Sequence, residues 1–170
     1  EEDRSATGIF SIQDSITEKI VASVASAHGI ISFHETTLRN EAGANELDSY
    51  ACVLRAHQFS WDVLAESYRR ARDCLMAAVE REPEYAEAWA WLGSVHMYGY
   101  AMGYNAEPNS LELAIEAAQR AFDIDPRNQI ALNVLAQTRY YLKEYELFYP
   151  LAEQAVALNP NNPAILGALG

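Results

Sequence analysis

The chain has 170 residues, of which half are hydrophobic and about a fifth are charged, a composition typical of a folded protein rather than a disordered one. Its 24 acidic and 12 basic side chains leave a formal net charge of −12. This charge argues against nucleic acid and anionic membranes as partners, because both attract basic surfaces, and it favours neutral or basic partners. No apolar run approaches the roughly 20 residues that span a bilayer, and two cysteines are too few for a disulfide framework.

The first 46 residues divide into two predicted segments. Residues 1–8 read as an acidic tail, and residues 9–46 as an N-terminal amphipathic helix followed by a linker. The helix is predicted because apolar side chains recur every three or four positions, at Ile9, Ile12, Ile16, Ile20 and Val24. Because the chain starts without Met and stops within a helical pattern, we expect it to be part of a longer protein.

One ending recurs three times in the remainder of the chain. Each copy is an alanine followed five positions later by a proline, at Ala78–Pro83, Ala121–Pro126 and Ala155–Pro160. The last two prolines lie 34 positions apart, and the first two lie 43 apart, which is the same period with a nine-residue insertion. Such a period predicts stacked helical hairpins. The predicted units are 47–85, 86–128 with an inserted loop, 129–162, and the truncated start of a fourth at 163–170.

Small residues in each unit are expected to let two antiparallel helices approach closely, while large apolar residues fill the space between turns. A proline ends the second helix of each unit, because it lacks an N–H and restricts the residue before it. The residues assigned to this packing are Trp89, Leu92, Gly93, Ala114, Ala118, Ala121, Pro126, Leu132, Leu135, Ala136, Ala152, Ala155 and Pro160.

The second unit opens with Trp89-x-x-Leu92-Gly93-x-x-His96, which resembles the tetratricopeptide signature W-x-x-L-G-x-x-Y with His in place of Tyr. Over residues 47–170 the chain therefore resembles the tetratricopeptide repeat (TPR) family. The resemblance implies an all-α fold, a superhelix of about three repeats and a partial fourth, here preceded by the N-terminal helix.

A second resemblance covers the order of the segments. Phe10-x-x-Gln13-Asp14 followed later by Leu47-Asp48-x-Tyr50 is similar to bacterial signalling regulators that join a class III adenylate or guanylate cyclase, or a winged-helix DNA-binding domain, through a TolB-like domain to TPRs. It implies that the N-terminal stripe contacts the first repeat or a second copy of the chain, as in a homo-oligomer. We expect a cytoplasmic protein, although some winged-helix relatives place their repeats beyond the inner membrane.

The family binds its ligands along a concave groove lined by the first helix of each repeat. Carried onto this sequence, that groove would be lined by Arg55, Ser94, Met97, Asn133, Gln137 and Tyr140. Some relatives grip a C-terminal carboxylate with a Lys, Asn and Arg clamp, which this sequence lacks; Ala51, for example, replaces the first Lys. The implied partner is therefore a different protein or peptide.

Tyrosines gather in two places. One group surrounds the insertion, at Tyr98, Tyr100 and Tyr104, and the other lies in the third repeat, at Tyr140, Tyr141, Tyr145 and Tyr149. Packing between helices is the favoured interpretation. The alternative is a contact site for a peptide or another domain, since Tyr supplies a large contact area at low entropic cost.

No set of side chains predicts an active site. The histidines at 28, 34, 57 and 96 lack the spacing of a metal site, and Cys52 and Cys74 are expected to be core thiols. The carboxylates at positions 80, 82, 84 and 87 are expected to form a solvated edge. We therefore expect no catalytic residue, no metal and no cofactor.

The leading hypothesis is a non-catalytic protein–protein interaction scaffold within a bacterial signalling or regulatory protein. The alternative is the regulatory region of a nucleotide cyclase, or of a winged-helix transcriptional regulator, whose catalytic or DNA-binding domain lies outside this segment.

Overall fold

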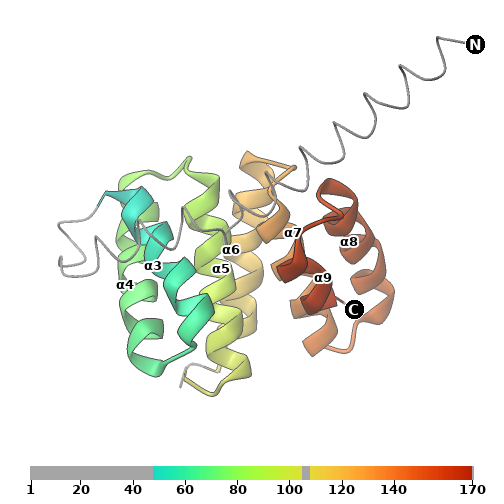
Figure 1. Ribbon diagram of the computed structural model, residues 1–170, viewed down its shortest axis with the longest axis horizontal. Coiled ribbons are helices and arrows are strands. Elements are labelled where there is room, and N and C mark those ends of the chain that lie inside the picture. Colours follow the sequence, from blue (N-terminus) through green and yellow to red (C-terminus); the bar gives the residue numbers. More distant parts are fainter. Residues whose placement is uncertain (1–47, 105–107, 170) are drawn as a thin grey trace, which may run out of the picture.

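The computed structural model describes residues 48–104 and 108–169, and this part of the chain is all-α. Its seven helices follow one another closely along the chain (Figure 1). They are α3 (Ser49–Asp62), α4 (Ala65–Arg81), α5 (Ala86–Ala101), α6 (Ser110–Ile124), α7 (Gln129–Tyr141), α8 (Tyr145–Leu158) and α9 (Pro163–Leu169). The predictions for the acidic tail, the N-terminal helix, the middle of the insertion and Gly170 lie outside the described residues.

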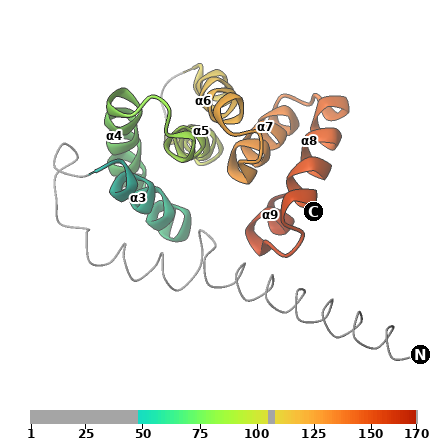
Figure 2. The same ribbon diagram turned by 90° about the horizontal axis from the view of Figure 1, so that it is seen from above.

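The helices pack in sequential pairs that form two rows. Seen from above, α4, α6 and α8 lie along the outer side of an arc, and α3, α5, α7 and α9 lie along its inner side (Figure 2). The most extensive packing joins α3 to α4, α5 to α6 and α7 to α8, and each pair also contacts the next. The inner helices α3, α5, α7 and α9 contact one another in that order.

Turn chemistry explains where the helices begin and end. The outer helices stop at Arg81, Ile124 and Leu158, each two residues before one of the recurring prolines. Two inner helices have side-chain caps: Asp48 accepts a hydrogen bond from the Ala51 amide at 2.7 Å, and Asn128 accepts one from the Ala131 amide at 2.9 Å. The prolines and the capping side chains, all visible in the sequence, thus mark the ends of these helices.

The core runs along the contacts between neighbouring helices. Most of the residues assigned to packing are buried, namely Leu92, Gly93, Ala114, Ala118, Ala121, Leu132, Leu135, Ala136, Ala152 and Ala155. Trp89 is half-buried and donates its indole N–H to the Pro83 carbonyl at 2.9 Å. Pro126 and Pro160 are exposed, since their part is to end helices rather than to fill the core.

Gly93 lies where α5 packs closely against the backbone of α6. A Cβ at this position would sit 2.9 Å from the Ala114 carbonyl oxygen and 3.1 Å from the Ala118 amide nitrogen. Both atoms belong to the backbone of α6, so they can yield only if the helix shifts. We therefore expect Gly93→Ala to lower the free energy of unfolding by about 1–3 kcal/mol, measured by chemical denaturation.

Gly167 provides the matched control. It also lies within a helix, but a Cβ there would meet nothing within 4 Å. Gly167→Ala should leave stability unchanged or raise it by up to about 1 kcal/mol through helix propensity. Equal effects of the two substitutions would contradict the close approach of α5 and α6.

Candidate functional site

One side of α7 carries three of the predicted groove residues, of which Tyr140 is exposed and Asn133 and Gln137 are half-buried. Asn133, Gln137 and Tyr140 are spaced four and three positions apart, so they share one face of the helix. The Gln137 side-chain amide donates a hydrogen bond to the Asn133 side-chain oxygen at 3.0 Å. We call these three residues the α7 stripe. This hydrogen bond fixes the orientation of the two side-chain amides relative to each other. Each amide can form further hydrogen bonds, because it carries more donors and acceptors than this bond uses.

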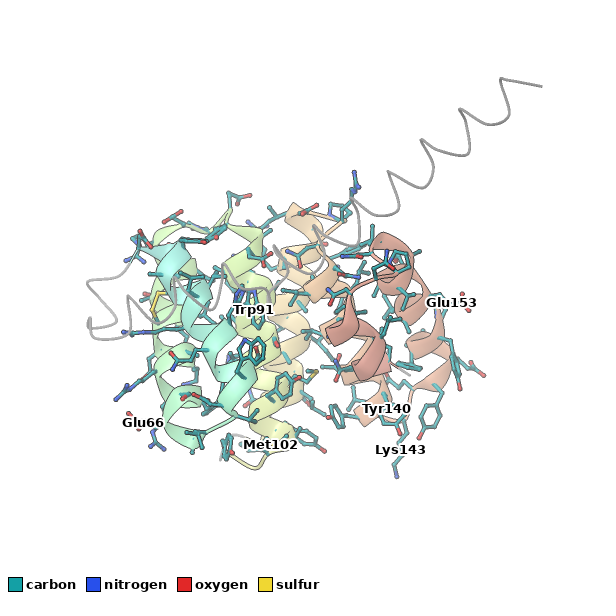
Figure 3. The ribbon with its side chains drawn as sticks, viewed as in Figure 1. Glu66, Trp91, Met102, Tyr140, Lys143 and Glu153 are labelled. Atoms are coloured by element: carbon teal, nitrogen blue, oxygen red, sulfur yellow. A yellow bond between two sulfur atoms is a disulfide. The ribbon has the colours of Figure 1, made fainter. Side chains whose placement is uncertain are left out.

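Tyr140 connects the α7 stripe to a second feature, a continuous series of aromatic rings that we call the aromatic ridge. Neighbouring ring centroids lie between 5.2 and 6.3 Å apart. The series runs from Tyr100 on α5 through Tyr141 and Tyr140 on α7 to Tyr145, Phe148 and Tyr149 on α8. Figure 3 shows Tyr140 near Lys143 at the edge of the molecule where the inner helices end.

The aromatic ridge is largely open to solvent. Tyr140 is 54% exposed and Tyr149 62%, and every ring except that of half-buried Phe148 is exposed. Partial burial, together with the nearby Tyr100 and Tyr140 hydroxyls, raises the pKa of Tyr141, so this hydroxyl stays protonated and neutral at physiological pH. Ring faces of this kind attract cations and pack against apolar groups, and the hydroxyls can donate hydrogen bonds.

The structure divides the tyrosines differently from the two groups identified in the sequence, because one member of the first group joins the second. Tyr98 and Tyr104 pack against the core, and the Tyr104 hydroxyl donates to the Val63 carbonyl at 2.6 Å. Tyr100 instead joins the aromatic ridge through Tyr141, with their centroids 5.6 Å apart. Tyr98 and Tyr104 therefore pack between helices, as the favoured interpretation expects. The other five tyrosines of the two groups lie in the exposed aromatic ridge.

The remaining predicted groove residues do not join the α7 stripe. Met97 is only 1% exposed and packs among residues of α6 and α7. Its assignment to the groove surface is therefore corrected: the register of α5 turns this side chain inward. Ser94 is also buried. Arg55 is 8% exposed and lies beside Ser67 and Arg70 at a small cavity of about 20 Å³ between α3 and α4. Burial, with Arg70 nearby, lowers the pKa of Arg55.

Glu87 is not part of a solvated edge, which corrects the expectation for it. The Trp91 indole N–H donates to its Oε1 at 3.1 Å, and the Asn128 side-chain amide donates to its Oε2 at 2.8 Å. Asn128 also caps α7, so Glu87 connects α5 to the start of that helix. Burial raises the pKa of Glu87 despite the two hydrogen bonds, which favour the charged form.

The raised pKa of Glu87 predicts a pH-dependent contribution to stability. The folded protein binds the proton more tightly than the unfolded chain, so this contribution is greatest below the ordinary value of 4.5 and is lost as pH rises through the folded pKa. Melting temperatures measured from pH 7 down towards pH 4.5 should therefore rise for the wild type relative to Glu87→Gln, which cannot titrate. A constant difference between the two proteins would contradict the prediction.

Cys52 and Cys74 form a disulfide between α3 and α4, with their Cα atoms 5.2 Å apart. This corrects the expectation of two core thiols: both residues are fully buried, but they are bonded to each other. Disulfides are typical of oxidising compartments and rare in the cytosol. Two cysteines separated by 22 positions gave no indication of pairing, because only the packing of the two helices brings them together.

Within residues 48–104 and 108–169, no three His, Cys, Asp or Glu side chains lie together as a metal site would require. None of the helices described is long and apolar enough to cross a membrane. Comparison with known proteins identifies no family: no family model matches the chain, and no curated protein matches it.

Proposed function

We propose that this chain is a non-catalytic interaction module of the tetratricopeptide type, which binds a protein or peptide through the α7 stripe and the aromatic ridge within a bacterial signalling or regulatory protein. The aromatic ridge carries the proposal. It places six neighbouring rings from three helices on one surface, and most of these rings are open to solvent. Tyr140 belongs both to this ridge and to the α7 stripe, which adds the hydrogen-bonded amides of Asn133 and Gln137. Solvent-exposed aromatic clusters of this size are characteristic of interaction sites.

The chemistry of the surface suggests what it binds. The Asn133 and Gln137 amides can hydrogen-bond the backbone of an extended segment, and the adjoining rings can accept apolar, proline or cationic side chains. The net charge of −12 favours a basic segment. The proposed partner is therefore an extended peptide segment with basic and apolar side chains.

The tetratricopeptide part of the proposal is supported by the sequential pairing of the helices and by the 34-residue spacing of Pro126 and Pro160.

The Cys52–Cys74 disulfide indicates the kind of cellular compartment in which the chain works. Because such bonds persist in oxidising environments, we propose that the chain works in one, the second of the two placements that the sequence left open, rather than in the cytoplasm.

Selection from a random peptide library tests the proposed surface, because the library offers extended segments of every composition to the same protein. Peptides enriched on the wild type should be rich in basic residues and in apolar or proline residues, and they should bind at least about tenfold more weakly to Tyr140→Ser and to Asn133→Ala with Gln137→Ala. Met76→Ser, which removes an exposed apolar side chain from α4, is the control and should bind normally. Failure to enrich peptides, or peptides indifferent to the α7 changes, would overturn the assignment.

A further inference from the structure

Four tyrosines of the aromatic ridge form two pairs, and each pair joins two helices. The ring centroids of Tyr100 on α5 and Tyr141 on α7 lie 5.6 Å apart, and those of Tyr140 on α7 and Tyr145 on α8 lie 5.7 Å apart. Both contacts are edge-to-face, with angles of 65° and 66° between the ring planes. The two pairs share no ring, so one pair can react without consuming the other.

Solvent reaches all four rings, which are between 36% and 54% exposed. The chain also contains a buried pair for comparison. Tyr68 and Tyr104 have their ring centroids 5.9 Å apart, but Tyr68 is only 1% exposed and belongs to the core. The pairs of the ridge therefore combine close approach of two phenols with access for a dissolved oxidant, whereas the core pair has only the close approach.

We infer that Tyr100 with Tyr141, and Tyr140 with Tyr145, are sites of oxidative crosslinking to dityrosine by hydrogen peroxide and a haem peroxidase. Each phenol gives up one electron and one proton and becomes a tyrosyl radical, while one peroxide molecule is reduced to two waters. The two radicals of a pair form a carbon–carbon bond between ring positions ortho to the oxygens. The hydrogens on those carbons then move to the oxygens, which restores both phenols, so each crosslink removes two hydrogen atoms from the protein.

The arrangement of the rings favours coupling within one molecule, because partners held side by side react as though at very high concentration. Small side-chain rotations bring the ring edges together, since exposed side chains change rotamer within nanoseconds. The crosslinks would tie α7 to both α5 and α8, whereas the Cys52–Cys74 disulfide ties α3 to α4. This inference is independent of the proposed peptide binding, because it requires only paired and accessible phenols.

Oxidation of the intact protein at low concentration with hydrogen peroxide and a haem peroxidase, followed by tryptic digestion and mass spectrometry, tests the assignment. Trypsin places the reacting tyrosines on three peptides, namely 82–120, 140–143 and 144–170. We expect monomeric protein in which the middle peptide is crosslinked to each of the other two. Tyr141→Phe should lower the yield of the first crosslink, and Tyr145→Phe that of the second, by at least about tenfold, because phenylalanine keeps the ring but cannot form the radical.

Tyr149→Phe is the matched control. Tyr149 is 62% exposed and lies on the same tryptic peptide as Tyr145, but its ring contacts Phe148, which has no phenol to oxidise. This substitution should leave both crosslinks unchanged, and oxidation of the wild type in urea should abolish the preference for them. Because no binding peptide is present, failure of the proposed interaction surface would not alter any of these results.

Three results would overturn the inference. The first is crosslinks that form only between molecules, or with the same preference in urea, since the folded arrangement would then play no part. The second is an equal loss of crosslinking in Tyr145→Phe and Tyr149→Phe. The third is a yield at the Tyr68–Tyr104 pair as high as in the ridge, because access to the oxidant would then not select the site.

Discussion

Reduction of the Cys52–Cys74 disulfide is expected to lower the free energy of unfolding by about 3 kcal/mol, because opening the bond releases a closed loop in the unfolded chain. The bond joins α3 to α4, the first pair of the described array, at a position where both cysteines are fully buried. The lost constraint should therefore appear as a fall in melting temperature on the order of 10 °C.

Thermal melts followed by circular dichroism, with and without a phosphine reductant, measure this effect. The variant carrying Cys52→Ala and Cys74→Ala serves as the control, since the reductant should not change its melting temperature. Alkylation under denaturing conditions must show that both thiols were released. An unchanged melting temperature in a fully alkylated wild-type sample would contradict a stabilising disulfide.

The same chemistry tests the proposed compartment. Blocking free thiols in intact cells before extraction should leave both cysteines unmodified if the chain resides in an oxidising environment. The thiol reagent should also be present when the cells are lysed in denaturant without reductant, so that it reaches the buried positions. Complete modification of Cys52 and Cys74 in that step would show that they are free thiols and would place the chain in the reducing cytoplasm instead.

Leu132→Ala is expected to lower the free energy of unfolding by about 2–5 kcal/mol, the range for deleting a buried leucine side chain. Leu132 has no exposed surface and lies on α7 between α8 and α9, where it packs with Ala155 and Ile165. The two flanking helices contact each other only sparsely, so they have little other support against which to close the cavity.

The matched control is Leu147→Ala, which makes the same chemical change at a position 52% exposed. Its effect on stability should stay within about 0.5 kcal/mol. Urea denaturation gives both values from the same experiment. A loss of less than about 1 kcal/mol at Leu132 would show that α7, α8 and α9 do not share the packing described.

The amino-acid sequence by itself determined the local features of this fold. The recurring prolines mark where the outer helices end, because a proline lacks the N–H that would extend the helical hydrogen bonding and disfavours helical backbone in the residue before it. Pro150 is different, since it lies inside α8. The periodic alanines and Gly93 predict close helix contacts, and those positions are buried. These properties depend on residues near one another in the chain, and they recur with a fixed period, so a single sequence reveals them.

The tertiary structure alone decided which way individual side chains face and which distant groups meet. Met97 lies inside and Tyr140 outside, although both belong to inner helices and the repeat pattern assigns them to the same groove. Glu87 meets Asn128, and Cys52 meets Cys74, through contacts between residues 41 and 22 positions apart. The aromatic ridge likewise needs rings from three helices. Helical periodicity predicts that a helix has an apolar face, but the rotation of each helix against its neighbours is set by packing, and packing decides whether a side chain becomes core or surface.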